Sequence, residues 1–145
     1  MEQFTHRVEV ALHEAQSLAL AEQNSELRPV HLLAAFLDLQ ESLLIEVCKQ
    51  KSLLQKLRER VKAAISSLPK LSSASGDLRM SSELGRVFAD ARKLSEEAGD
   101  QFVAEEWVLL SLLRDSELSQ LTRPLGLTPD LIEAAATEYR QGEKC

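Results

Sequence analysis

Apolar residues recur at steps of three and four along most of this chain, which is the spacing of one face of an α-helix. One apolar stripe opens the sequence, and a similar stripe begins shortly after residue 80. The first contains Phe4, Val8, Leu12, Ala15 and Leu18, and the second contains Leu84, Phe88, Ala91 and Leu94. The pattern predicts helices over residues 4–23, 29–39, 42–50, 53–67, 82–98, 104–114, 116–124 and 129–141.

The two stripes belong to an internal repeat. A shift of 76 residues places Val8 on Leu84, and it places residues 31–37 on the equally apolar residues 107–113. After a slip of one residue, the match extends into the last helix. We therefore predict an all-α fold of about eight helices, built by tandem duplication of a four-helix unit and arranged as one compact domain with a pseudo-two-fold axis.

The repeats are expected to cover residues 4–67 and 81–140. Residues 68–80 contain Pro69 and a Ser/Gly cluster, which is typical of an exposed connector. Residues with a preference for helix ends lie at the predicted boundaries. The N-cap candidates are Thr5, Ser81 and Thr128, the first-turn prolines are Pro29 and Pro129, and the C-terminal glycines are Gly99 and Gly126.

Composition narrows the possible partners. The chain has 145 residues and a formal charge of −6, and its basic side chains are interleaved with acidic ones. A nucleic-acid-binding domain needs a basic stripe, so we expect no nucleic-acid partner. No apolar run has the length of a membrane span and the first residues do not resemble a secretory signal, so we expect a cytoplasmic protein without membrane contact.

Residues that could carry catalysis or bind a metal do not form a recognisable motif. The five glycines form no phosphate-binding loop, and His13-Glu14 lacks the second histidine of a zinc-protease helix. We interpret His31 as a hydrogen-bonded core residue and Cys48 as a buried apolar one. The sequence therefore predicts no catalytic residue, no metal site and no cofactor in this segment.

Several motifs together resemble the Clp N-terminal repeat domain. The first half carries Phe4-Thr5 and then the run Pro29-Val30-His31-Leu32-Leu33-Ala34-Ala35-Phe36-Leu37. The second half carries Ser81-Ser82-Glu83-Leu84 and then Gly99-Asp100-Gln101-Phe102-Val103-Ala104-Glu105-Glu106 before Trp107-Val108-Leu109-Leu110. The resemblance covers nearly the whole chain and is strongest to the ClpB-type subgroup of the family.

This resemblance implies the amino-terminal domain of a hexameric AAA+ disaggregase that threads polypeptides through a central pore in collaboration with a DnaK-type chaperone. ATP and Mg²⁺ would bind in ATPase modules outside these residues, and residues 141–145 would begin the linker to them. The part left for this segment is the capture of unfolded or aggregated polypeptides, and we expect the isolated domain to be a monomer.

The resemblance also implies three substrate-handling residues, which are Thr5, Asp100 and Glu106. Each has a structural alternative, because Thr5 suits an N-cap, Asp100 follows a helix-ending glycine and Glu106 lies in a first helical turn. The first repeat has Val30 where the second has Glu106, so a charged site should be biased to the second repeat. Trp107 replaces a histidine, and we interpret it mainly as a core residue that needs a hydrogen-bond partner.

We expect a shallow groove where the two units meet, with an apolar lining and a few polar groups at its rim. Phe4, Leu12 and Leu78 are candidate lining residues. Two alternatives remain open, which are an adaptor-docking domain of a ClpA- or ClpC-type protease unfoldase and a free-standing scaffold with Clp repeats. A third, an unrelated helical enzyme, would need catalytic groups that the sequence does not offer.

Overall fold

The computed structural model describes residues 4–71 and 77–140, and it forms eight α-helices in this part of the chain. In chain order they are α1 (His6–Ala21), α2 (Pro29–Leu37), α3 (Leu43–Gln50), α4 (Leu54–Ser66), α5 (Ser82–Glu97), α6 (Glu105–Arg114), α7 (Ser116–Thr122) and α8 (Pro129–Arg140). Each boundary lies within two residues of the predicted one. The all-α class and the two-repeat architecture are thereby confirmed.

The predicted helix 116–124 differs most from the structure. It is divided into α7 and a 3-10 turn, η1 (Arg123–Leu125). Pro124 has no backbone N–H to donate one turn back, so the α-helical pattern stops before it. Gly126 then ends the turn with φ of 84°, a left-handed conformation that glycine adopts without steric cost.

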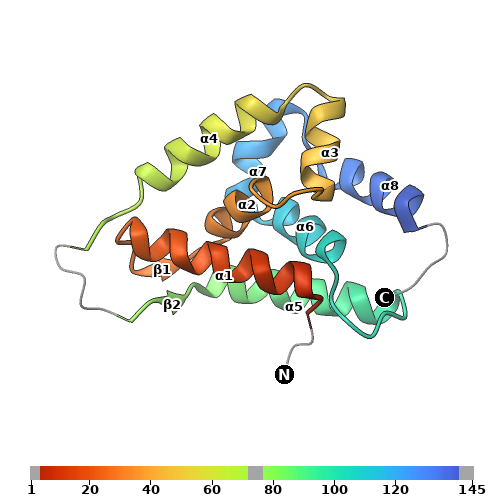
Figure 1. Cartoon of the computed structure of the whole chain (residues 1–145), viewed down its shortest axis with the longest axis horizontal. Helices are drawn as coiled ribbons and strands as arrows, with labels where there is room; N and C mark the ends of the chain where they lie inside the picture. Colours follow the sequence, from red (N-terminus) through yellow and green to blue (C-terminus); the bar gives the residue numbers. More distant parts are fainter. Residues whose placement is uncertain (1–3, 72–76, 141–145) are drawn as a thin grey trace.

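The centre of the molecule is formed by α2 and α6 (Figure 1). Their apolar runs leave few polar positions, and most residues of both helices are buried. Burying a leucine such as Leu33 or Leu109 stabilises the fold by about 1.5 to 3 kcal/mol. The other helices surround this pair, with α1 against α2, α5 against α6, α4 against α2 and α8 against α6.

The pseudo-two-fold relation between the repeats appears in their contacts. The third helix of the first repeat, α3, packs against the last helix of the second, α8, and α4 packs against α7 in the same exchanged manner. Two short strands, β1 (Glu26–Leu27) and β2 (Arg79–Met80), pair in parallel. A shift of 76 residues converts the Leu27–Met80 pair into the second parallel contact, between Phe4 and Val103.

The strands were not predicted, and β2 lies within the segment expected to be an exposed connector. The described residues of that segment do lie mostly at the surface, but they are attached to the first repeat. Leu71 N donates to the carbonyl oxygen of Gln23 at 2.8 Å, and Asn24 Nδ2 donates to the carbonyl oxygen of Pro69 at 3.2 Å. The Ser/Gly cluster, residues 72–76, and residues 141–145 lie outside the described residues.

Candidate functional site

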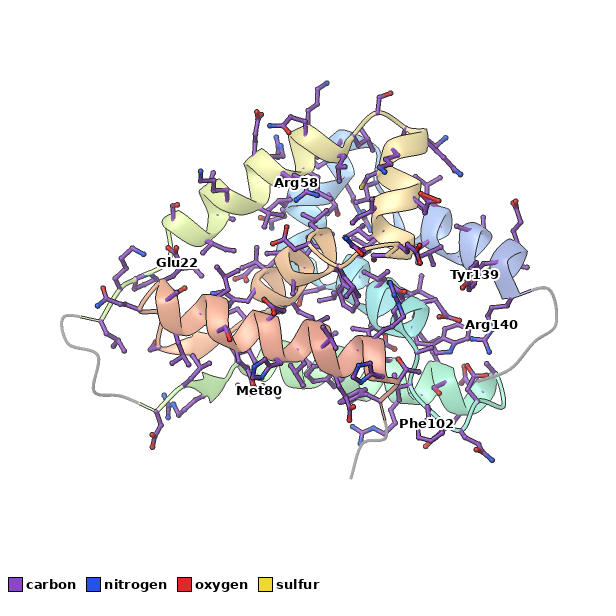
Figure 2. The ribbon with its side chains drawn as sticks, viewed as in Figure 1. Glu22, Arg58, Met80, Phe102, Tyr139 and Arg140 are labelled. Carbon is purple, nitrogen blue, oxygen red and sulfur yellow. The ribbon has the colours of Figure 1, made fainter. Side chains whose placement is uncertain are left out.

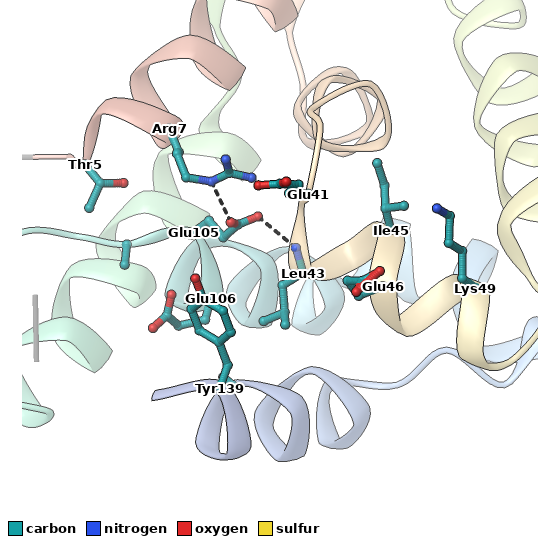
Figure 3. Close-up of a pocket in the computed structure, with 12 residues that line it drawn as sticks. Thr5, Arg7, Glu41, Leu43, Ile45, Glu46, Lys49, Glu105, Glu106 and Tyr139 are labelled. Carbon is teal, nitrogen blue, oxygen red and sulfur yellow. Dashed lines mark hydrogen bonds and ion pairs between the residues drawn. The ribbon is translucent and has the colours of Figure 1, made fainter. Parts of the chain in front are cut away.

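A pocket of about 570 Å³ lies where the two repeats meet. It is bounded by the start of α1, the outer face of α3, the start of α6 and the end of α8 (Figure 3). We call it the inter-repeat groove. Its lining residues are Thr5, Arg7, Glu41, Leu43, Ile45, Glu46, Lys49, Ala104, Glu105, Glu106, Ala136 and Tyr139.

The groove is more polar than predicted. Its apolar surface comes mainly from Leu43 and Ile45, which are half-buried on α3, and from Tyr139 on α8, which is 81% exposed. Exposed Glu46 and Lys49 lie beside them. The polarity has a simple origin, because the outer face of α3 faces solvent and the first turn of α6 carries two glutamates.

Glu105 joins three parts of the chain at one side of the groove. Its carboxylate accepts hydrogen bonds from Arg7 Nε at 3.0 Å, Ser42 Oγ at 2.8 Å and the backbone N–H of Leu43 at 3.3 Å. It also lies in the first turn of α6, where the helix dipole favours a negative charge. Glu105 therefore holds the start of α1 and the start of α3 against α6.

The second glutamate, Glu106, belongs to a compact cluster behind the groove. Arg140 Nη1 donates to Glu106 Oε2, and Arg140 Nη2 donates to Asp100 Oδ1. The other Asp100 oxygen accepts the indole N–H of Trp107 at 2.7 Å, and the guanidinium lies 5.3 Å from the centre of the Trp107 ring. We call Asp100, Glu106, Trp107 and Arg140 the Arg140 cluster.

The Arg140 cluster is largely inaccessible to solvent. The exposed fraction of the side chain is 0% for Asp100, 11% for Glu106 and 13% for Arg140. The hydrogen bond to Asp100 and the charge of Glu106 raise the pKa of Arg140 above its ordinary value, so the guanidinium stays charged. Each of the two carboxylates therefore has a cationic partner within the protein.

The structure brings two of the six predicted site residues into the groove lining, which are Thr5 and Glu106. Asp100 is not among the lining residues, but it bonds Arg140, which also bonds Glu106. The other three, Phe4, Leu12 and Leu78, are partly buried against the core and are not among the lining residues.

Thr5 is also the N-cap of α1, as expected. Its Oγ1 accepts a hydrogen bond from the backbone N–H of Val8 at 3.4 Å, and Ser81 caps α5 in the same way through Leu84 at 3.1 Å. Phe4, immediately before this cap, packs its ring 5.2 Å from that of Phe88. The N-terminal turn of α1 therefore has a structural role whether or not it also contacts a ligand.

The other expectations for individual side chains can be compared with their surroundings. Trp107 is partly buried against the core and has the hydrogen-bond partner that its indole was expected to need. His31 is fully buried, accepts at Nδ1 from the backbone N–H of Arg28 and lies 2.9 Å from Asn24 Oδ1 through Nε2. Burial lowers the pKa of His31 to about 4 and raises the pKa of buried Cys48 to about 11.

Within residues 4–71 and 77–140, no three His, Cys, Asp or Glu side chains are grouped in a way that could hold a metal ion. None of the described helices is long and apolar enough to cross a membrane.

Sequence analysis did not identify Arg7, Glu105, Tyr139 or Arg140 as site residues. Their partners lie far away along the chain, at a separation of 98 residues for Arg7 and Glu105 and 40 for Arg140 and Asp100. The sequence offered one signal, the adjacent Glu105 and Glu106 in a first helical turn. Acidic residues are common at that position, so this signal did not identify their partners.

Three comparisons relate this structure to known proteins. A family model described as the Clp repeat (R) N-terminal domain matches residues 3–125. The chaperone protein ClpB from Vibrio vulnificus is 32% identical over 99% of this chain, and ClpB from Rhodopseudomonas palustris is 36% identical over 98%. In each case the chain corresponds to 17% of the relative's length.

Among solved structures, the Hsp104 N-terminal domain from Candida albicans superposes with a TM-score of 0.88 at 28% identity, covering 99% of this chain and 95% of that one. The N-terminal domain of ClpD from Arabidopsis thaliana shares the fold with a TM-score of 0.71 at 22% identity, covering 97% and 96% of the two chains. The similarity thus extends over the whole described structure.

Proposed function

Because this chain belongs to the Clp repeat N-terminal domain family, we propose that its inter-repeat groove captures exposed apolar segments of unfolded or aggregated polypeptides. The observation that carries the proposal is an apolar surface, formed by Leu43, Ile45 and Tyr139, that faces solvent inside a groove shared by both repeats. Such a surface is suited to the apolar segments that distinguish unfolded chains from native ones.

The electrostatics of the groove are compatible with binding that does not depend on a particular sequence. Glu105 and Glu106 both have cationic partners within the protein, Arg7 and Arg140 respectively. A polypeptide does not have to supply a matching charge at those two positions. Burial of apolar area is non-directional, so a groove of this kind binds many segments weakly.

Weak capture fits a larger assembly. The chain spans about one sixth of the length of its ClpB relatives, so the remaining parts of such a protein would contain the ATP- and Mg²⁺-dependent modules. In a hexamer, six tethered copies of this domain would gain avidity while each releases its segment readily. We propose that threading and cooperation with a DnaK-type chaperone in the cytoplasm belong to that whole protein.

The proposal is tested by fluorescence anisotropy with the 145-residue chain. The probe is a fluorescein-labelled, reduced and carboxymethylated polypeptide, and its native disulfide-bonded form is the folded counterpart. We expect saturable binding of the unfolded form alone. Ile45→Gln, which removes apolar surface from the groove, should weaken it about fivefold, the scale of one good interface contact.

Leu20→Gln is the matched control, because Leu20 is 57% exposed on α1 and is not among the groove-lining residues. It removes a similar apolar side chain and should leave binding unchanged. Absence of binding to the unfolded probe would contradict capture, and a folded adaptor that binds with defined stoichiometry would then replace it as the partner.

A further inference from the structure

Arg140 is the last residue of α8, and its guanidinium bridges two carboxylates from the other side of the groove. Asp100 comes from the segment between α5 and α6, and Glu106 comes from the first turn of α6. Trp107 lies against the guanidinium and shares Asp100 with it. The planar fork of arginine suits this double contact, which a lysine ammonium cannot reproduce.

Asp100 is placed poorly for direct contact with a polypeptide. Its side chain has no exposed surface, and its two oxygens bond to Arg140 and Trp107. A polypeptide in the groove would have to displace at least one of these bonds to reach it. Breaking a buried ion pair is costly, because the charge that remains is neither solvated nor paired.

Arg140 itself is connected to the groove wall. Tyr139 precedes it, Ala136 lies one turn earlier on the same helix, and both line the groove (Figures 2 and 3). On the opposite side of the ion pair, Glu106 lines the groove and lies in the first turn of α6. The bond between Arg140 and Glu106 therefore fixes the distance between two walls of the groove.

In the first repeat, the positions equivalent to the Arg140 cluster contain no acidic residue and no arginine. The shift of 76 residues relates Asp100 to Asn24, Glu106 to Val30 and Trp107 to His31, and the slip of one residue relates Arg140 to Ile65. Asn24 and His31 are hydrogen-bonded to one another, and Val30 and Ile65 are buried. The ionic version is thus a feature of the second repeat, the one whose last helix forms a wall of the groove.

We propose that Arg140 is a positioning residue of the inter-repeat groove, and that Asp100 and Glu106 contribute to polypeptide capture as its two anchors without contacting the polypeptide. This inference rests on the proposed function. It assigns a shared role to the two acidic residues, and it places Tyr139 and Ala136, together with the α3 surface, at the contact with the polypeptide.

A set of variants of the 145-residue chain separates anchoring from direct contact. Arg140→Gln, Asp100→Asn and Glu106→Gln should each weaken binding of the reduced and carboxymethylated probe, by about three- to tenfold on the scale of single interface residues. Because the residues act through one cluster, their effects should not add. The double variant Asp100→Asn/Arg140→Gln should bind the probe with an affinity no lower than that of the single variant with the lower affinity.

The decisive variant introduces the residues of the first repeat, as Asp100→Asn/Glu106→Val/Arg140→Ile. Replacing a buried ionic triad by apolar residues often leaves a fold as stable or makes it more stable. We expect this triple variant to bind within about twofold of the original chain, since α8 is held again although both carboxylates are gone. Tenfold weaker binding at unchanged helicity would show that the carboxylates contact the polypeptide and would overturn the inference.

Trp107 provides a second readout, because it is the single tryptophan of the chain. With an unlabelled probe that lacks tryptophan, such as reduced and carboxymethylated ribonuclease A, binding should leave the Trp107 emission of the original chain nearly unchanged, because Trp107 does not line the groove. Arg140→Gln should shift this emission without any probe, because it removes the guanidinium that lies 5.3 Å from the Trp107 ring. If its emission stays that of the original chain while its binding is weakened, Arg140 does not act through the cluster.

Arg114→Gln is the matched control, since Arg114 ends α6, pairs with exposed Asp90 and does not line the groove. It should change neither binding nor emission. If Arg140→Gln loses helicity, Arg140→Lys is used instead, and it should show the same weakened binding. If Ile45→Gln weakens binding and no variant of the Arg140 cluster does, this inference is overturned while the proposed function stands. If no chain binds the probe, including the original one, the proposed function is overturned.

Discussion

The two repeats meet at two equivalent junctions, one at the start of α6 and one at the start of α2. The first contains the inter-repeat groove, and in the second Arg28 occupies the corresponding place. The shift of 76 residues relates Ala104 to Arg28 and Glu41 to Glu117. In the first junction Ala104 and Glu41 line open space. In the second, Arg28 donates to Glu117 at 2.9 and 3.0 Å and to Glu26 at 2.8 Å.

The size and charge of one side chain therefore distinguish the two junctions. Alanine leaves a volume between the helices, and arginine fills it and supplies the partner for the surrounding carboxylates. The hydrogen bond to Glu117 raises the pKa of Arg28 above its ordinary value, so it remains a cation. Two copies of one unit can thus keep the same fold while an arginine stands in one of them where the other has an alanine that lines the groove.

A second comparison concerns the hydrogen-bonded pairs inside each repeat. His31 is paired with Asn24 in the first repeat, and Trp107 is paired with Asp100 at equivalent positions in the second. The first pair contains a titratable ring and a neutral amide. The second contains a ring that cannot titrate and a carboxylate held by Arg140. The two repeats should consequently respond differently to acid.

The largest expected effect is a loss of stability when His31 would have to be protonated. Burial lowers its pKa to about 4, whereas the unfolded chain takes up the proton near the ordinary value of 6.5. Between these values the unfolded state binds more protons, so stability is full above pH 6.5 and is lost as the pH falls toward 4. At pH 5 this amounts to about 2 kcal/mol.

The measurement is urea denaturation at pH 7.5 and at pH 5, followed by helical circular dichroism. His31→Gln has no ring to titrate, so its difference between the two pH values should be smaller by most of that amount. His13→Gln is the control, because His13 is exposed on α1. An equal pH difference in the His31→Gln chain and the original chain would contradict this origin.

The next largest effect is expected when the groove receives the arginine of the other junction. Ala104→Arg should place a guanidinium near Glu41, as Arg28 lies near Glu117, and fill the groove. We expect binding of the unfolded probe to fall about tenfold, corresponding to about 1.4 kcal/mol. Anisotropy measures the affinity, and circular dichroism verifies that the helical content of the chain is unchanged.

Arg28→Ala is the complementary variant, and it should leave probe binding in the groove unchanged. It should cost less than about 1 kcal/mol of stability, because two of its carboxylate partners, Glu26 and Glu117, are at least one-third exposed. If Ala104→Arg binds the probe as tightly as the original chain, the captured segment lies elsewhere on the molecule.

These comparisons show what could be predicted from the sequence. Helical periodicity and the repeat predicted all eight described helices, because each helix buries a stripe that is visible in the local spacing. The two-residue strands β1 and β2 carry no such period. Their pairing follows from how the repeats dock, which local spacing does not contain.

The candidate site was predicted only in part for the same reason. Thr5 was identifiable as a cap from its neighbours, and Trp107 was known to need a partner for its indole. The partner of Glu106 is Arg140, which is 34 residues away and at the end of the last helix. A contact between such distant residues is fixed by the packing of α8 on α6, so only the structure reveals it.

The smallest effect concerns the two equivalent caps, Thr5 and Ser81. Thr5→Ala and Ser81→Ala each remove an oxygen that accepts a helix N–H, at 3.4 Å and 3.1 Å respectively. We expect losses of about 0.5 kcal/mol for Thr5 and about 1 kcal/mol for Ser81, the better bonded and more buried cap. Thr5 also lines the groove, so Thr5→Ala should weaken probe binding about twofold, while Ser81→Ala leaves it unchanged. Denaturation measures the stability of both variants and anisotropy measures their affinity for the probe. If the affinity falls in proportion to the lost stability in both variants, Thr5 acts only as a helix cap.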